Sequence, residues 1–368
     1  MFKAAVIVTI NNEYPLTENF VTNMLSLLPN IYQLVMVADG PTDVLTYRYL
    51  QKLHNEKKNV KVHFLMENKG FSAANNVAVR LTEAEYLIFV NSDTFPEKGS
   101  LEQLIAYLEQ HKDVGVVQGM IISPQNNKVQ STGHIFAFYK TSHAFDGRDV
   151  EDPLVNQVYE RQALASGFYA VSHTLFEKFN GFDEFYYNAW EGLEFSLKVH
   201  LSGMKCVYIP TARAYHVKGS GRNRLFRDET YQSAYFWSKW ADKIHMDINQ
   251  IFKDQLIALA LSSSYFGINA SAYRNNIWEK IIENLPITCY GFYNITHAIG
   301  NDRVSFEDSI PASIINSANN ILFVADHFST ILNNSHFFHF RNKVRDVILD
   351  MHGNVICPQD YYQNRGSK

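Results

Sequence analysis

Short apolar runs alternate with amphipathic segments over the first 122 or so residues of the chain. The apolar runs have the length and composition of strands, and the amphipathic segments have the spacing of helices. The expected strands are residues 4–10, 32–37, 60–66, 86–90 and 114–122, and the expected helices are residues 18–28, 44–56, 72–81 and 100–111. Repeated βα units of this length predict an α/β fold with a mostly parallel, doubly wound, Rossmann-like sheet and right-handed crossovers.

The alternation of predicted strands and helices becomes weak between Ser123 and Gln162, and the sequence pattern changes again after Asp228. The first stretch, with HIFAFYK at its centre, predicts loops and a hairpin. The segments expected next are a strand-like run at 163–172, helices at 174–179 and 191–201, a strand at 205–209, helices at 231–252, 254–264 and 277–283, and strands at 321–325, 347–349 and 355–356. We therefore expect a domain of residues 1–226 and a mainly helical C-terminal domain of residues 227–368.

Polar residues follow each of the first four predicted strands. They are Thr9, Asn11 and Glu13, then Asp39 and Gly40, then Asn68 and Gly70, then Asn91 and Asp93. The carboxyl ends of parallel strands meet at one edge of the sheet, so these side chains predict a single crevice. Gly70 also precedes a predicted helix, where free amides and the helix dipole favour an anion.

The segment EYLIFVNSDTFPE marks the sharpest change from core to polar residues. Its apolar run has the composition of a strand buried on both faces, and it stops at Asn91, Ser92 and Asp93. A carboxylate just past such a strand is well placed to hold a cation against a phosphate. The same residues also suit an ordinary turn, with Pro96 opening the next helix.

Composition and charge narrow the class of protein. Hydrophobic residues at 46% and charged residues at 19% describe a globular protein, and a net charge of -4 argues against a nucleic-acid partner. The three cysteines are far apart without a CxxC pair, which fits a reducing cytoplasm. No apolar run approaches the length of a transmembrane segment, so we expect that the protein contacts a membrane only at the surface of the membrane.

Two further clusters carry little weight. Gly219 and Gly221 lie among four Lys and Arg residues and one His between Arg213 and Arg224, which suggests either a loop that closes over a diphosphate or a solvated linker. His336 and His339 lie near each other in the sequence without a set of further ligands, which favours a structural role.

Five motifs follow one another in the first 225 or so residues: VIVTINNE, ENKGFSAANNVAVR, VNSDT, GFDEFYYNAWEGLEFSLKVHLSG and AYHVKGSG. Together they resemble the family 2 glycosyltransferases of the GT-A fold, especially the bacterial enzymes that build surface polysaccharide. The resemblance covers about three fifths of the chain and says nothing about the C-terminal part.

The resemblance implies a site for a nucleotide-diphosphate sugar, of UDP or dTDP type, along the crevice. The base and ribose would be bordered by Thr9, Asn11, Glu13 and Asp39, and the diphosphate would lie beside Asn68, Gly70 and Asn75. Mg or Mn would be bound by Asp93 and His216, and the rest of the turn would consist of Asn91 and Ser92. Two residues depart from the family pattern. Ala38 replaces a common acidic residue, and Gly192 replaces the aspartate of the family's ED pair, which is the expected general base.

The missing aspartate matters because displacement at an anomeric carbon needs a carboxylate to accept the proton of the acceptor hydroxyl, and a cation for the departing diphosphate. Glu191 lies beside Gly192, and Glu194 lies one helical turn further on. Both carboxylates also suit the first turn of a helix, where the dipole favours negative charge. We favour Glu191 as the base, with Glu194 as the rival.

The resemblance implies an inverting, metal-dependent glycosyltransferase that acts on a saccharide or lipid-linked acceptor in the cytoplasm or at the inner face of the cell membrane. A catalytically silent GT-A module for binding or assembly is the main alternative, and Gly192 is the argument for it. A nucleotidyltransferase is a further alternative, although INNEYP is not a glycine- and lysine-rich triphosphate loop. The C-terminal domain is open to acceptor binding, homo-oligomer formation or membrane-surface contact.

Overall fold

The computed structural model describes residues 1–11, 13–40, 42–217, 229–261, 264–271, 275–294, 320–326, 341 and 345–358. Gly219, Gly221, His336 and His339 lie outside these residues. The chain divides into two compact units, Met1–His134 with Asp146–Ile244, and Ile135–Phe145 with His245–Lys368. This division differs from the expected one, because residues 227–244 belong to the first unit and residues 135–145 belong to the second.

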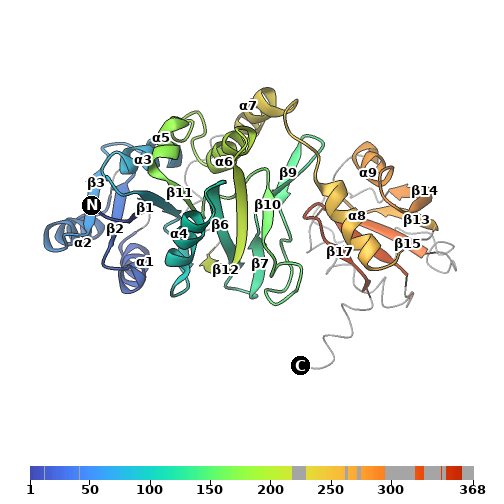
Figure 1. The fold of residues 1–368 in the computed structure, drawn as a ribbon, viewed down its shortest axis with the longest axis horizontal. Helices are drawn as coiled ribbons and strands as arrows, with labels where there is room; N and C mark the ends of the chain where they lie inside the picture. Colours follow the sequence, from blue (N-terminus) through green and yellow to red (C-terminus); the bar gives the residue numbers. More distant parts are fainter. Residues whose placement is uncertain are drawn as a thin grey trace. The chain divides into compact units, whose positions relative to one another are not determined.

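A ten-stranded sheet forms the centre of the first unit (Figure 1). Its strands are β1 (Ala4–Ile10), β2 (Tyr32–Ala38), β3 (Val60–Phe64), β4 (Tyr86–Val90), β5 (Thr94–Pro96), β6 (Val114–Ser123), β7 (Lys128–Ser131), β10 (Tyr159–Arg161), β11 (Phe168–Ser172) and β12 (Lys205–His216). The main order is β10-β12-β6-β11-β4-β1-β2-β3, with β5 paired to β12 and β7 paired to β6. Within this order, β11 runs antiparallel to both β4 and β6, and β10 runs antiparallel to β12.

Helices cover both faces of this sheet, because alternate residues of each buried strand point to opposite sides. Val6 and Val8 face a core that includes α1 (Tyr14–Leu27), α2 (Val44–Glu56) and α4 (Ser100–Gln110). Ala5 and Ile7 face the other core, which includes α3 (Phe71–Val79), α5 (His173–Lys178) and α6 (Glu191–Leu201). The predicted mostly parallel, doubly wound α/β fold is confirmed.

Two expectations at the edge of the crevice are wrong. Pro96 ends the short strand β5 instead of opening a helix, and α4 begins only at Ser100. The strand expected at 205–209 continues to His216, because its second half pairs with β5 and with the end of β6. This pairing brings the segment that ends in His216 next to the segment that follows β4.

The second unit contains a five-stranded sheet in the order β14-β13-β15-β16-β17. Its elements are α8 (Ile248–Ala258), β13 (Ser264–Asn269), α9 (Asn275–Ile282), β14 (Thr288–Asn294), β15 (Asn320–Ala325), β16 (Val347–Asp350) and β17 (Val355–Ile356). All neighbouring strands are parallel except β16 and β17. The described part of this unit is therefore mixed α/β, which corrects the expected mainly helical character.

The helix boundaries explain this correction. The helix expected at 231–252 is divided into α7 (Glu229–Trp240) and α8, and the helix expected at 254–264 covers the end of α8 and the first residue of β13. The strands expected at 321–325, 347–349 and 355–356 are confirmed as β15, β16 and β17.

The expected hairpin is also confirmed, as β8 (His134–Ala137) and β9 (Lys140–His143). It is fixed within the second unit. The backbone N–H of Phe136 donates to Oδ1 of Asp247 at 2.6 Å, and that of Phe145 donates to the carbonyl of His352 at 2.8 Å. Residues from the middle of the sequence therefore complete the C-terminal unit.

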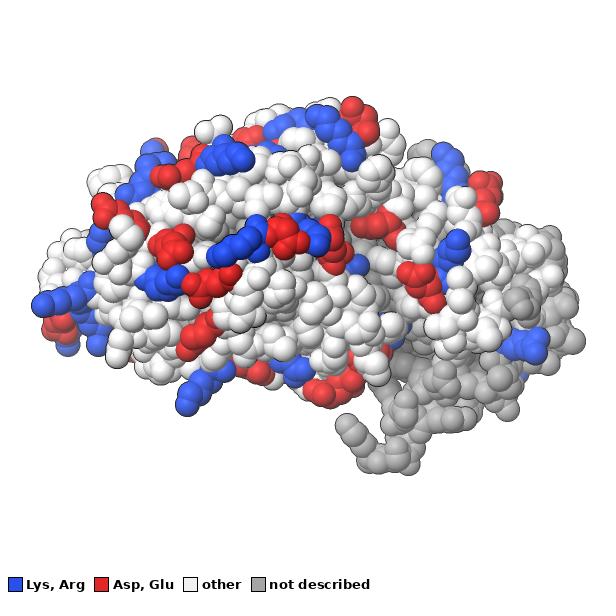
Figure 2. All heavy atoms as spheres, viewed as in Figure 1, with Lys and Arg blue, Asp and Glu red and all other residues white. Residues whose placement is uncertain are grey.

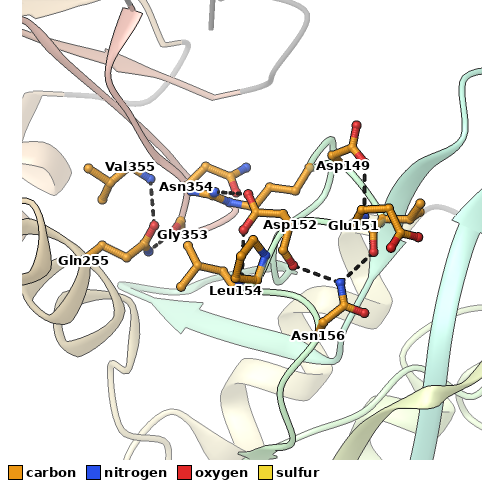
Figure 3. A network of polar contacts seen from close by, with 12 residues as sticks. Asp149, Glu151, Asp152, Leu154, Asn156, Gln255, Gly353, Asn354 and Val355 are labelled. Carbon is orange, nitrogen blue, oxygen red and sulfur yellow. Dashed lines mark hydrogen bonds and ion pairs between the residues drawn. The ribbon is translucent and has the colours of Figure 1, made fainter. Parts of the chain in front are cut away.

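Polar residues between the main elements are tied into local networks (Figure 3). In the second unit, Gln255 on α8 donates from Nε2 to the carbonyl of Gly353 at 2.7 Å and accepts from the N–H of Val355 at 3.3 Å. In the first unit, Nδ2 of Asn156 donates to the carbonyl of Asp152 at 3.0 Å. These groups have protein partners, so they stabilise turns.

The surface carries charges of both signs. Figure 2 shows lysines and arginines interspersed with aspartates and glutamates over the described residues of the face that it displays. This mixture fits the small net charge and gives no general attraction to a polyanion. None of the helices in the described ranges has the length and apolar character needed to cross a membrane.

Candidate active site

The carboxyl ends of β1 to β4 lie along one edge of the first unit's sheet. The strands stand in the order β3-β2-β1-β4, and the register pairs Ile10 with Ala38 and Ala38 with Phe64, so the first three strands end level. Strand order reverses between β1 and β4, which is where open α/β sheets bind ligands. Thr9 lies near the end of β1, and the other polar residues predicted for the crevice follow strands that end at this edge.

Asp39 fixes the turn that leads into α3. Its carboxylate accepts hydrogen bonds from the backbone N–H of Lys69 at 2.7 Å and of Gly70 at 3.0 Å. The side chain is buried, and burial raises the pKa of its carboxyl while the two amides oppose that shift. Asn68 supports the same turn, since its Oδ1 accepts from the N–H of Gly70 at 3.1 Å. Asp39 and Asn68 thus act together on the glycine turn.

Gly70 is required by a close contact with Tyr187. Its φ is +87°, and a Cβ there would lie 2.5 Å from the carbonyl oxygen of Tyr187. The N–H of Phe71 donates to that same carbonyl at 2.7 Å, and the hydroxyl of Tyr187 donates to Asn68. The amides of Gly70 and Phe71 therefore already have protein acceptors, which weakens the expected anion-binding role of this helix start.

The FDEFYY segment is docked on α3 by Asn76, a residue that the sequence analysis did not select. Oδ1 of Asn76 accepts from the N–H of Phe182 at 3.0 Å, and Nδ2 donates to its carbonyl at 2.9 Å. The neighbouring Asn75 is buried and donates to the carbonyl of Phe71 at 2.8 Å. Two adjacent asparagines in the sequence gave no signal about which of them would hold the distant segment.

Asp93 and His216 lie together although they are far apart in the sequence. The pairing of β5 with β12 places His216 opposite Thr94, and the N–H of Val217 donates to the carbonyl of Asp93 at 2.9 Å. As a result, Nε2 of His216 lies 3.3 Å from Oδ1 of Asp93. Both side chains are about four fifths buried. The two residues expected to bind a metal are therefore brought to one place.

The chemistry of this pair fits a divalent cation. A carboxylate and an imidazole are both ligands for Mn²⁺, and the carboxylate alone suits Mg²⁺. Over the described ranges, no group of three or more His, Cys, Asp or Glu side chains is arranged to hold a metal ion. A cation between Asp93 and His216 would thus need further oxygen ligands, which a nucleoside diphosphate supplies.

Glu191 is buried at the start of α6. Oε1 of its carboxylate accepts from Oγ of Ser166 at 3.0 Å, whereas Oε2 is buried without a hydrogen-bond partner in the described part of the chain. Burial raises the pKa of this carboxyl. The two residues before it, Ala189 and Trp190, have φ values of +87° and +74°, a strained approach that is often found at functional sites.

The contact with Ser166 explains why residue 192 is a glycine. A Cβ at residue 192 would lie 2.1 Å from Cβ of Ser166, so no larger side chain fits there. The next residue, Gly167, accepts through its carbonyl from the N–H of Asn91 at 3.2 Å. The dipeptide 166–167 therefore contacts both Glu191 and the turn that carries Asp93. The sequence analysis missed Ser166, which lies in an apolar segment without a motif.

Glu194 has a different environment. It is fully buried and accepts from Nζ of Lys239 and from Nε1 of Trp240, the latter at 3.0 Å. Lys239 also lies 3.0 Å from Oδ2 of Asp183, and Nζ of Lys198 lies 3.5 Å from Glu194. Glu194 is thus the centre of an ion-pair network that joins α6 to α7, which disfavours it as the general base.

The remaining predicted residues lie at the ends of β1 and β4. Oγ1 of Thr9 and Oδ1 of Asn91 are buried without hydrogen-bond partners among the residues that the structure describes. Ser92 is half-buried in the turn after β4, whereas Asn11 and Glu13 are exposed. Glu13 precedes α1 as its N-terminal cap.

The fold of the first unit is of the GT-A type. A solved structure described as GalNAc-T7 with UDP, GalNAc and Mn²⁺ superposes with a TM-score of 0.56 and 14% identity, over 68% of this chain and 51% of that chain, which shows the shared fold. Within this class, residues 5–168 match the sequence model of glycosyl transferase family 2. This region of the chain is therefore similar to the glycosyltransferases of family 2.

Two curated relatives come from Staphylococcus aureus. The poly(ribitol-phosphate) beta-N-acetylglucosaminyltransferase TarS is 32% identical over 118 residues, which cover 30% of this chain and 20% of TarS. The poly-beta-1,6-N-acetyl-D-glucosamine synthase is 23% identical over 209 residues, which cover 55% of this chain and 47% of the synthase. The matches span less than half the length of each relative.

Proposed function

We propose that this protein is an inverting, metal-dependent glycosyltransferase that moves a sugar from a nucleoside diphosphate donor to a saccharide or lipid-linked acceptor of a bacterial surface glycan. The observation that carries the proposal is the link through residues 166–167, which contact both Glu191 and the turn of Asp93. The names of both relatives contain N-acetylglucosamine, which makes UDP-N-acetylglucosamine the first donor to test.

The pair formed by Asp93 and His216 would stabilise the leaving group. Asp93 and His216 would hold Mg²⁺ or Mn²⁺, which supplies the positive charge that a departing diphosphate needs. Asp39 and Asn68 keep the glycine turn at Gly70 in place beside this edge. The donor would lie along the ends of β1 to β4, where Oγ1 of Thr9 and Oδ1 of Asn91 have no partner among the described residues.

Glu191 supplies the general base. As the acceptor oxygen forms its bond to the anomeric carbon, Oε2 of Glu191 takes the hydroxyl proton and the bond to the diphosphate breaks on the opposite side, so the configuration inverts. The raised pKa makes the ionised carboxylate a stronger base than an ordinary glutamate. Ser166 occupies Oε1 and thereby leaves Oε2 for the acceptor.

The test is transfer of labelled N-acetylglucosamine from its UDP donor by the purified full chain, with Mn²⁺ or Mg²⁺ present, to glycan or lipid-linked acceptors from bacterial envelopes. We expect cation-dependent transfer, and cation-dependent release of UDP by hydrolysis when the acceptor is omitted. A panel of UDP- and dTDP-sugars tests the donor. Binding of nucleotide without turnover of any donor would contradict the proposal.

A catalytically silent GT-A module is the second candidate. It is favoured by one observation, that Ser166 fills the place of the family's aspartate. Such a module would still bind a nucleotide with Mn²⁺ through Asp93 and His216 but would neither transfer the sugar nor hydrolyse the donor. The same assay therefore separates the two candidates.

A further inference from the structure

Gln130 makes two hydrogen bonds to a single residue, His216. Its Nε2 donates to the backbone carbonyl of His216 at 2.8 Å, and its Oε1 lies 2.9 Å from Nδ1 of the imidazole. The side chain is 4% exposed, so water does not compete effectively for these bonds. A two-point contact of this kind fixes both the position and the rotation of the ring.

The strand register accounts for the position of Gln130. In the pairing of β6 with β7, Ile122 is opposite Val129 and Ile121 is opposite Ser131, so Gln130 lies at a shift in register. Such an irregularity re-aims a side chain, and it is common next to active sites. Gln130 thus reaches His216 on β12 instead of continuing the regular alternation of β7.

The hydrogen-bond directions assign the proton on the imidazole. A backbone carbonyl only accepts, so the amide nitrogen of Gln130 must face the carbonyl of His216 and the amide oxygen must face Nδ1. The amide oxygen also only accepts, so Nδ1 carries the proton. In the neutral ring the lone pair is then on Nε2, the atom that lies 3.3 Å from the carboxylate of Asp93.

Two electron-rich atoms at this distance repel each other unless a proton on Nε2 or a metal cation lies between them. We propose that Gln130 is a positioning residue that holds His216 in its Nδ1–H tautomer, so that Nε2 and the Asp93 carboxylate bind one divalent cation together. The inference rests on the cation site of the proposed function. Histidine ligands of metals commonly donate their second N–H to such a partner, whose loss costs about 10- to 100-fold in metal affinity.

The first experiment measures Mn²⁺ binding to the full-length protein with saturating UDP by calorimetry. Gln130→Met keeps the size of the side chain and removes both hydrogen bonds, whereas Gln130→Glu keeps an acceptor for Nδ1. We expect Gln130→Met to weaken Mn²⁺ binding by about 10-fold or more, and Gln130→Glu to retain most of the affinity.

Gln33→Met is the matched control. Gln33 is also a buried glutamine of the first unit, and its Oε1 accepts from Oγ1 of Thr82 at 2.7 Å. Its replacement removes a buried hydrogen bond away from His216, so we expect a similar loss of thermal stability with unchanged Mn²⁺ affinity. Equal Mn²⁺ affinity of Gln130→Met and the wild type would show that Gln130 is only structural.

A second readout follows the tautomer itself. Nitrogen-15 chemical shifts of His216 in the metal-free protein, at a pH where the ring is neutral, should show the Nδ1–H form in the wild type and a mixture in Gln130→Met. The Nε2–H form in the wild type would overturn the inference. Failure of the wild type to bind Mn²⁺ would overturn the cation site as well, whereas Mn²⁺ binding without sugar transfer would overturn only the proposed activity.

Discussion

The hydroxyl oxygen of Ser166 lies 2.4 Å from the point where a Cβ on Gly192 would stand. The two residues thus share one space, and only one of them has a side chain. An aspartate at 192 would collide with Ser166, so restoring the family's usual ED pair requires a change at both positions. The departure from the family pattern therefore involves two positions, because the side chain of Ser166 occupies the space that an aspartate side chain at residue 192 would need.

Gly192→Asp should be destabilising because it overpacks a buried contact. We expect a loss of about 1–3 kcal/mol in the free energy of unfolding, measured by denaturant titration. Ser166→Gly combined with Gly192→Asp should recover part of that loss, since the double variant removes the collision. A double variant that is no more stable than the sum of the two single changes would contradict this relationship.

Glu191→Gln should lower turnover by on the order of a hundredfold or more, the usual scale for loss of a general base, with donor binding nearly unchanged. The measurement is kcat for sugar transfer alongside the Kd for UDP. Ser166→Ala is the comparison variant, because it removes the bond to Oε1 and leaves the carboxylate in place. Near-normal turnover in Glu191→Gln would assign the base elsewhere.

The pH dependence of the same residue has a definite sign. Burial raises the pKa of Glu191 in the folded protein above the ordinary value of 4.5, so the folded state binds this proton more tightly than the unfolded state. Its favourable contribution is full below pH 4.5 and is lost as pH rises through the raised pKa. Glu191→Gln should therefore be more stable than the wild type at neutral pH, and the difference should vanish in acid.

Activity should move in the opposite direction with pH. The base must be ionised, so turnover should fall on the acidic side at a pH above the range of an ordinary glutamate. Chemical or thermal unfolding at several pH values, combined with pH profiles of kcat, tests both statements. An acid limb that persists in Glu191→Gln would show that another group controls it.

Lys239→Met should destabilise the protein because it leaves the buried carboxylate of Glu194 with fewer charged partners. Lys239 is about a third exposed and Lys198 remains nearby, so we expect a loss of about 3 kcal/mol or less. Glu194→Gln keeps an acceptor for Trp240 and should retain sugar transfer. Abolished turnover in a stably folded Glu194→Gln variant would instead make Glu194 the base.

Asp93→Ala should abolish cation-dependent UDP binding and sugar transfer while the fold stays intact. The side chain lies beyond β4 and outside both cores of the sheet, so its removal leaves no cavity there. Calorimetry with UDP and Mn²⁺ measures the binding, and circular dichroism monitors the fold. Treatment of the wild type with chelator should reproduce the loss, and full activity of Asp93→Ala in chelator would end the idea of a metal site.

The pattern of apolar residues predicted the strands of the first unit well, because each buried strand is a continuous apolar run in the sequence. Apolar runs such as Ala4–Ile10 and Tyr86–Val90 are buried on both faces and have the observed boundaries of β1 and β4. Asp93 and His216, which the resemblance implies as metal ligands, lie 3.3 Å apart. The roles of the individual site residues stay predictions until binding and kinetics are measured.

The partners of these residues could not be read from the pattern. Ser166 and Gln130 contact residues that are distant in sequence, and Gln130 lies at a shift in strand register that no local motif encodes. Two strands of the C-terminal sheet, β13 and β14, were not predicted for a related reason. The aromatic segments Ser264–Asn269 and Thr288–Asn294 carry no polar alternation, and their strand character comes from pairing with each other and with β15.

The hairpin at residues 135–145 has a consequence for synthesis on the ribosome. Phe136 precedes its partner Asp247 by 111 residues, and Phe145 precedes its partner His352 by 207 residues. Strands β8 and β9 can pair with each other as soon as they are synthesised, whereas their contacts with Asp247 and His352 form only after those residues have been made. A recombination event that exchanged only residues after 244 would separate this hairpin from its native partners, so exchange of the whole second unit requires three crossovers, before residue 135, after residue 145 and before residue 245.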